Sequence, residues 1–177
     1  MKAGLSKRVL LSTAALLAIA TCAPAQRAVW RQATDTELAS VLPSRAPVGS
    51  EHIETEMRTA SGIVDSHGHF IAGVVLLTAG YSVEGKFSHY LVVQAPVRIG
   101  GVELKPGRYV FGWTRASDGD SLSVHFNVAE TGELIGTADA HRIVGSTRVE
   151  SLHIWPPGEM GMIQIGRFGI PYKLGAD

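Results

Sequence analysis

Three side chains able to bind a metal ion alternate within one short segment of the chain. In residues 62–70, GIVDSHGHF, the residues Asp65, His67 and His69 occupy every second position. Carboxylates and imidazoles are common ligands of zinc and of other transition metals. The pattern therefore suggests metal-dependent hydrolysis, or looser binding of a metal ion in a loop.

The same segment has the composition of a tight turn. Asp65 and Gly68 suit the first and last positions of a type I turn, and apolar pairs flank them as the arms of a hairpin. Taken alone, the segment resembles the first-strand motif of amidohydrolases, whose barrel needs upwards of about 200 residues. Only about 107 residues follow Phe70, and their pattern is that of antiparallel strands. We interpret the segment as a turn, with a metal site at Asp65, His67 and His69 as the alternative.

A second group of polar residues belongs to a predicted hairpin that turns at residues 130–132. Ser121, Ser123, His125 and Asn127 alternate with four apolar residues, and Thr137, Asp139 and His141 lie on the returning strand. Serine, histidine and aspartate on one face could act as nucleophile, base and orienting group. A flat strand, however, provides neither a sharp turn for the serine nor paired amides for an oxyanion. This favours a solvated face, or one that binds a sugar or a peptide.

Aromatic residues offer further candidates for binding. Period two places Tyr109, Phe111 and Trp113 on one side of a strand, which favours a place in the core. Trp155 precedes Pro156-Pro157-Gly158 and therefore borders an exposed loop, where it could contact a partner or plug the end of a sandwich. The candidate ligand-binding residues are Ser123, His125, Asn127, Asp139, His141 and Trp155.

The rest of the chain must supply the strands that position these residues. Runs of alternating or dense apolar character, separated by glycine and proline, predict nine or ten short strands between residues 52 and 173. Gly100-Gly101 and Lys105–Arg108 are turn signals. The expected fold is all-β, an antiparallel β-sandwich or a small, partly closed barrel.

The segment before these strands is expected to be a lead-in, over residues 26–49. Thr34 and Glu37 form a capping box ahead of an apolar pattern that Pro43 closes, which predicts one short helix. Arg45-Ala46-Pro47 is interpreted as a linker to a single β-domain over residues 50–177.

The first 25 residues have the features of a secretory signal peptide. The segment begins with basic residues, continues with an apolar run over residues 9–20 and ends with Ala23-Pro24-Ala25. The run is too short to span a bilayer. Cys22, the one cysteine, lies in this segment, and a lipid anchor there is a less favoured alternative because Ile19-Ala20-Thr21 is a poor approach to it.

Charge argues against nucleic acid or anionic lipid as a partner. Three of the 16 basic residues and none of the 16 acidic ones lie in residues 1–25, so 13 cations remain against 16 acids, a formal charge of −3. Nothing in this balance favours binding to a polyanion.

Two segments between residues 61 and 113 carry a family resemblance. They are "SGIVDSHGHFIAGVVLL", with Gly62, Val64, Asp65, Gly68, Ile71 and Val75, and "LKPGRYVF", with Leu104, Pro106, Gly107 and Tyr109. At these residues the chain resembles the carboxypeptidase regulatory-like domains, which are prealbumin-type β-sandwiches. The resemblance implies an accessory module without catalytic residues.

These observations predict an exported, non-catalytic binding or accessory module of the periplasm or cell surface. A glycan or a peptide is the expected kind of ligand, and no cofactor and no membrane span are expected. The alternatives are a small secreted hydrolase, using the Ser/His/Asp face or a histidine-bound metal, and a structural component of the envelope.

Overall fold

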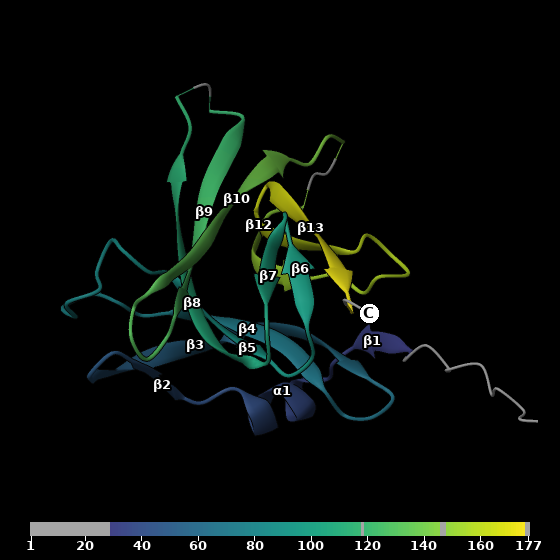
Figure 1. Cartoon of the computed structure of the whole chain (residues 1–177), viewed down its shortest axis with the longest axis horizontal. Helices are drawn as coiled ribbons and strands as arrows, with labels where there is room; N and C mark the ends of the chain where they lie inside the picture. Colours follow the sequence, from purple (N-terminus) through teal and green to yellow (C-terminus); the bar gives the residue numbers. More distant parts are fainter. Residues whose placement is uncertain (1–28, 118, 146–147, 176–177) are drawn as a thin grey trace, which may run out of the picture.

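An antiparallel sheet curls until its two ends nearly meet, as the computed structural model shows (Figure 1). The structure describes residues 29–117, 119–145 and 148–175. The predicted signal peptide over residues 1–25 and its Cys22 lie outside this part of the chain. The expectation of an all-β fold, in the form of a partly closed barrel with a short helix, is confirmed.

The described residues contain 13 strands and one helix. The elements in chain order are β1 (Trp30–Gln32), α1 (Asp35–Val41), β2 (Arg45–Val48), β3 (Glu51–Asp65), β4 (Phe70–Leu76), β5 (His89–Val93), β6 (Val97–Ile99), β7 (Val102–Leu104), β8 (Gly107–Arg115), β9 (Ser121–Val128), β10 (Leu134–Arg142), β11 (Glu150–Ile154), β12 (Met162–Gly166) and β13 (Phe168–Leu174).

All neighbouring strands pair antiparallel, in the order β1-β3-β4-β5-β8-β9-β10-β13-β12-β11. Strand β2 pairs with residues 51–54 of β3, and the β6–β7 hairpin joins β13. In Figure 1, β8, β9 and β10 rise on one side and β12 and β13 on the other, while β3, β4 and β5 cross below them. The ladder between β10 and β13 joins the two groups of strands.

The middle of the sheet is buried on both of its faces. Every residue of β5 is buried. Leu91 points into the barrel, in the same cluster as Phe111, whereas Tyr90 and Val92 point outward into a second cluster. Leu38 of α1 belongs to this outer cluster. Burial on two sides explains why β4 and β5 have dense apolar sequences rather than strict alternation.

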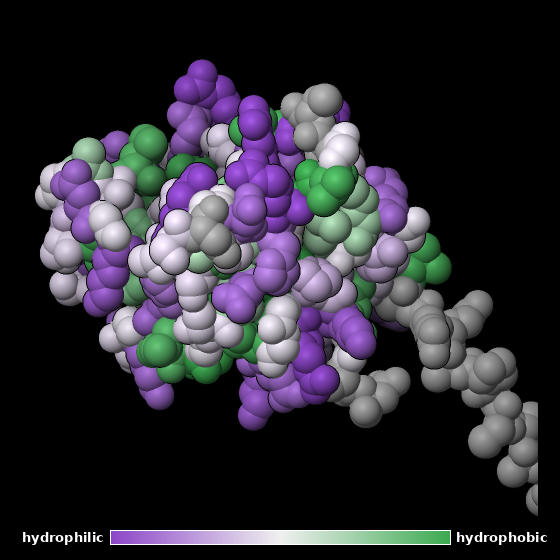
Figure 2. All heavy atoms as spheres, turned by 90° about the horizontal axis from the view of Figure 1, so that it is seen from above, coloured by the Kyte–Doolittle hydropathy of each residue, from purple (hydrophilic) through white to green (hydrophobic). Residues whose placement is uncertain are grey.

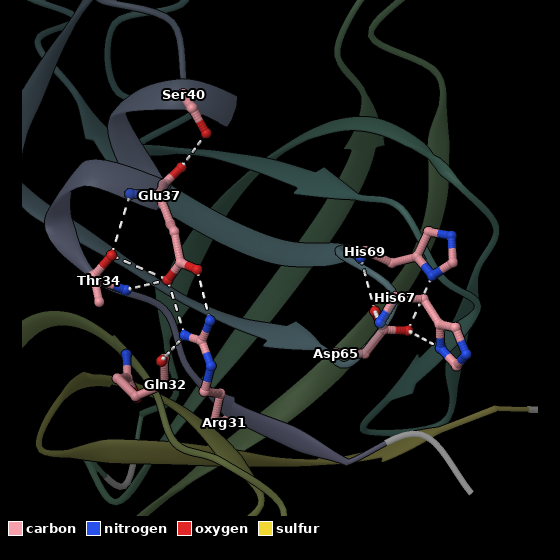
Figure 3. A network of polar contacts seen from close by, with 8 residues as sticks. All are labelled: Arg31, Gln32, Thr34, Glu37, Ser40, Asp65, His67 and His69. Carbon is pink, nitrogen blue, oxygen red and sulfur yellow. Dashed lines mark hydrogen bonds and ion pairs between the residues drawn. The ribbon is translucent and has the colours of Figure 1, made fainter. Parts of the chain in front are cut away.

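The helix begins and ends where its capping residues predict. The Thr34 side chain accepts a hydrogen bond from the backbone N–H of Glu37, and the Glu37 carboxylate accepts one from the Thr34 N–H (Figure 3). Arg31 adds an ion pair to Glu37 at 2.6 Å. The helix has seven residues. No helix in the described part of the chain is long and apolar enough to cross a membrane.

The interpretation of Arg45-Ala46-Pro47 as a linker is wrong. These residues open strand β2, which pairs with residues 51–54 of β3. Ala46 and Val48 are buried in the outer cluster. Pro47 is tolerated because β2 pairs with β3 alone and needs no second set of backbone donors.

Side chains, rather than a ladder, close the barrel between its two ends. Strand β11 lies against β3 and β4, and no ladder joins it to either. The buried Ser61 accepts a hydrogen bond from the N–H of Ile154 at 2.9 Å. Gly73 allows the close approach, because a Cβ there would lie 2.9 Å from the Leu152 side chain. We call this contact between β11 and the β3–β4 pair the seam.

His89 of β5 forms a second polar contact with β11, beside the seam. Its Nε2 lies 3.2 Å from the carbonyl oxygen of Ser151, and its ring stacks on Phe111 with centroids 4.6 Å apart. A carbonyl oxygen only accepts, so Nε2 carries the proton and Nδ1 accepts from the Ser88 hydroxyl at 2.8 Å. Burial lowers the pKa of His89 to about 4, against the opposing effect of the Ser151 carbonyl.

We predict that Ser61→Ala destabilises the protein by about 1–3 kcal/mol, because it leaves the buried N–H of Ile154 without an acceptor. Urea unfolding followed by circular dichroism measures the change. Ser123→Ala, at an outward-facing position of β9, is the matched control and should stay within about 0.5 kcal/mol of wild type. Equal losses in the two variants would contradict a role for Ser61 in the seam.

We also predict that stability falls as the pH is lowered below about 6.5. The unfolded chain binds a proton at His89 near its ordinary pKa of 6.5, whereas the folded chain does so only near pH 4. The stability that comes from neutral His89 is therefore complete above pH 6.5 and is lost as the pH falls towards 4. Between about pH 7 and pH 4.5 the loss should be about 2–3 kcal/mol. Urea titrations of wild type and His89→Gln at both pH values test this, and identical pH dependence of the two would show that His89 is not responsible.

Candidate functional site

The segment that suggested a metal site forms a tight turn between β3 and β4. The N–H of Gly68 donates to the Asp65 carbonyl at 3.1 Å, and the N–H of Asp65 donates to the carbonyl of His69 at 3.0 Å. Gly68 has φ of 85°, a left-handed conformation that favours glycine. The prediction of a turn with Asp65 first and Gly68 last is confirmed.

The Asp65 carboxylate has a different partner on each oxygen. Oδ1 accepts hydrogen bonds of 2.8 Å from the backbone N–H groups of His67 and His69. Oδ2 lies 2.9 Å from Nδ1 of His69 and 3.7 Å from Nδ1 of His67 (Figure 3). Burial opposes ionisation, but the hydrogen bonds from His69 and His67 outweigh it and lower the pKa of Asp65. The turn thus brings all three predicted ligand residues together.

The polar residues of the β9–β10 hairpin lie in register on the outer face of the sheet. Ser123 pairs with Asp139, and His125 pairs with Thr137. The intervening Val124 is buried in the core, as the alternation predicts. Among the described residues, no side-chain hydrogen bond or ion pair joins Ser123, His125 and Asp139. The row therefore gives the serine hydroxyl no base within hydrogen-bonding distance.

His141 and Asn127, at the two ends of this row, differ in exposure. His141 pairs with Ser121 and is exposed. Asn127 is only 7% exposed, although the alternation places it on the polar face. Its Nδ2 donates to the carbonyl of Gly132 at 2.9 Å, and its Oδ1 is buried without a partner. Asn127 is therefore held inside the hairpin turn rather than presented to solvent.

Trp155 lies just beyond β11, half-buried and held by several contacts. Its Nε1 donates to Oε1 of the buried Gln164 at 3.0 Å, and its carbonyl accepts a hydrogen bond from the Tyr172 hydroxyl. The ring of His153 lies against it, with centroids 4.1 Å apart. These contacts fix the indole, which is separate from the β9–β10 row.

The structure also shows a cavity that sequence reasoning missed, where the ends of β8, β10 and β12 meet the starts of β9 and β13. Its volume is about 460 Å³. We call it the mouth; its lining residues are Trp113, Arg115, Leu122, Arg142, Val149, Ile165, Gly166, Arg167 and Phe168. Viewed from above relative to Figure 1, the molecule has hydrophilic residues gathered centrally with hydrophobic ones beside them (Figure 2).

Arginines dominate the charge of the mouth. The guanidinium groups of Arg115 and Arg142 lie 5.3 and 5.4 Å from the centroid of the Phe168 ring. Arg142 also donates to the carboxylate of Asp120 at 3.1 Å. Within the described part of the chain, no carboxylate pairs with Arg115 or Arg167. The mouth therefore has uncompensated positive charge beside an aromatic surface.

A second cavity, of about 410 Å³, lies beside the β6–β7 hairpin and the end of β13. Val97 and Leu104 contribute apolar walls, and Arg98 lies at its edge. Arg98 is already paired with Glu103, on the neighbouring strand. Among the described residues, the arginine of this cavity is therefore paired, unlike Arg115 and Arg167 in the mouth, and Lys105 and Lys173 also line the cavity.

Comparisons with protein-family models, with curated proteins and with solved structures find no match to this chain.

We predict that Asp65→Ala destabilises the protein by about 1–3 kcal/mol, because two N–H groups of the turn lose their acceptor. Asp65→Asn should be less damaging, because the amide oxygen can still accept from both groups. Urea unfolding of the two variants measures the difference. Equal destabilisation by alanine and asparagine would argue that the negative charge, rather than the acceptor, holds the turn.

Proposed function

We propose that this protein is an exported, non-catalytic binding module that holds a ligand with an anionic group and an apolar face in the mouth of its barrel. The observation that carries the proposal is the presence of three arginines in the lining of one cavity, two of them without a carboxylate partner in the described chain. Two of the three, Arg115 and Arg142, lie over the Phe168 ring. The proposed ligand is the acidic part of a glycan or peptide, or a comparable carboxylate.

The charges of the mouth favour an anion. Arg115 and Arg142 approach the same aromatic ring, and within the described residues only Arg142 of the two has a compensating acid, Asp120. Like charges close together repel each other, and a bound carboxylate or phosphate relieves that repulsion. Guanidinium groups also match the geometry of these anions by donating two parallel hydrogen bonds.

The walls of the mouth favour a ligand that also has an apolar face. Trp113 is 40% exposed although it follows Tyr109 and Phe111 on the inward side of β8. Its indole is therefore available to a ligand at the rim, with Leu122 and Ile165 deeper in the wall. A cavity of about 460 Å³ lies within the usual range for small-ligand sites, roughly 300–1,000 Å³.

Two features of the sequence support the export and accessory parts of the proposal. Residues 1–25 have the pattern of a signal peptide. The resemblance of residues 61–113 to carboxypeptidase regulatory-like domains implies a module without catalysis. The absence of hydrogen bonds among Ser123, His125 and Asp139 in the described structure is consistent with that implication.

The test is calorimetric titration of the mature protein with two matched pairs of probes. The pairs are a galacturonic acid trisaccharide with its neutral galactose counterpart, and decanoate with decanol. We expect at least one anion to bind with one ligand per chain, with affinity that falls as salt is raised, and its neutral counterpart to bind more weakly. Equal binding within both pairs, or no binding of either anion, would overturn the proposal.

Substitutions then place the bound anion. Arg115→Gln and Arg167→Gln should each weaken binding roughly tenfold or more, because each removes a charge-assisted hydrogen bond. Arg45→Gln, an exposed arginine of β2 that does not line the mouth, is the matched control and should bind like wild type. If all three variants bind like wild type, the ligand lies elsewhere.

A further inference from the structure

We propose that Asp65, His67 and His69 form a binding site for a divalent transition-metal ion, such as Zn²⁺ or Cu²⁺, on the turn between β3 and β4. This site is independent of the proposed ligand site, because none of the residues that line the mouth belongs to β3, β4 or their turn. The role proposed for it is metal binding, with no hydrolytic step.

The positions of the donor atoms carry the proposal. One donor atom from each of the three residues can be chosen so that all lie within 4.8 Å of one another. The separations from Asp65 Oδ2 are 2.9 Å to His69 Nδ1 and 3.7 Å to His67 Nδ1. Ligand atoms about 2.0–2.2 Å from a tetrahedral zinc ion are separated by roughly 3.3–3.6 Å. Small rotations of the two rings are enough to reach that spacing.

The turn prepares the carboxylate for this role. Oδ1 is occupied by the N–H groups of His67 and His69, so Asp65 cannot rotate without losing two hydrogen bonds. Oδ2 is thereby directed towards both imidazoles, and the aspartate side chain is only 5% exposed. The carboxylate oxygen is therefore fixed before an ion arrives, which reduces the entropy lost on binding.

The donor set selects the class of metal. Two imidazoles and one carboxylate suit zinc, copper or nickel, whereas calcium and magnesium prefer oxygen donors throughout. The side chains of His67 and His69 are 64% and 54% exposed, so an ion can reach them directly from solvent. Three protein ligands leave at least one coordination position for water or for a donor from another molecule.

The test is calorimetric titration of tag-free mature protein with zinc chloride and, separately, copper chloride, in a weakly coordinating buffer near neutral pH. We expect one ion per chain for at least one metal. His67→Ala and His69→Ala should each weaken binding roughly tenfold or more, and the double variant should abolish this binding event. His141→Ala, which removes another exposed histidine, is the matched control and should retain it.

Two further readouts keep the outcome clear. Urea unfolding without metal should show that the double variant still unfolds cooperatively, because the turn bonds to Asp65 Oδ1 come from backbone groups. Its urea midpoint should be somewhat lower than that of wild type, because Asp65 Oδ2 loses its contact with Nδ1 of His69. Imidazole NMR signals of His67 and His69 should change on addition of zinc, and those of the buried His89 should not. Stoichiometry well below one ion per chain for both metals, or a double variant that binds like wild type, would overturn the proposal.

Discussion

The seam between β11 and the β3–β4 pair is the contact on which the rest of the barrel depends. Backbone ladders hold every other neighbouring pair along the sheet, but the two ends meet through Ser61, His89 and apolar packing around Leu152. Buried polar contacts of this kind stabilise only when they are fully paired. The seam therefore fixes the position of β11 and, through its ladders, of β12 and β13.

The geometry of the mouth depends on the closure of the barrel at the seam. Trp113 and Arg115 lie on β8, and Arg142 ends β10. Arg167 lies between β12 and β13, and Phe168 is the first residue of β13. The two groups of strands are joined where Arg142 of β10 pairs with Phe168 of β13. The ladder between β10 and β13 is short and covers only residues 141–142 of β10. The angle between the β8–β10 strands and the β12–β13 strands therefore depends largely on the seam. A cavity with its cations on both sides requires that angle to be fixed.

Local patterns in the sequence predicted what depends on local chemistry. The capping box at Thr34 and Glu37, the Asp65–Gly68 turn and the alternation in β9 are each set by neighbouring residues, and the structure confirms them. The sequence could not reveal β2, because Pro47 argues against a strand until an edge position is known. Nor could it reveal the mouth, whose residues are as far apart as Trp113 and Phe168 and meet only through the order of strands in the sheet.

The segment SGIVD, residues 61–65, shows how closely local and long-range requirements are combined in this fold. Ser61 accepts the seam hydrogen bond, Ile63 points into the barrel, Val64 points into the outer cluster, and Asp65 organises the turn. Each of these residues is buried, so no position in the segment is free for solvent. The exposed imidazoles of His67 and His69 follow directly after it. The buried end of β3 therefore holds the Asp65 carboxylate in place, and it fixes the oxygen that the proposed metal site would use.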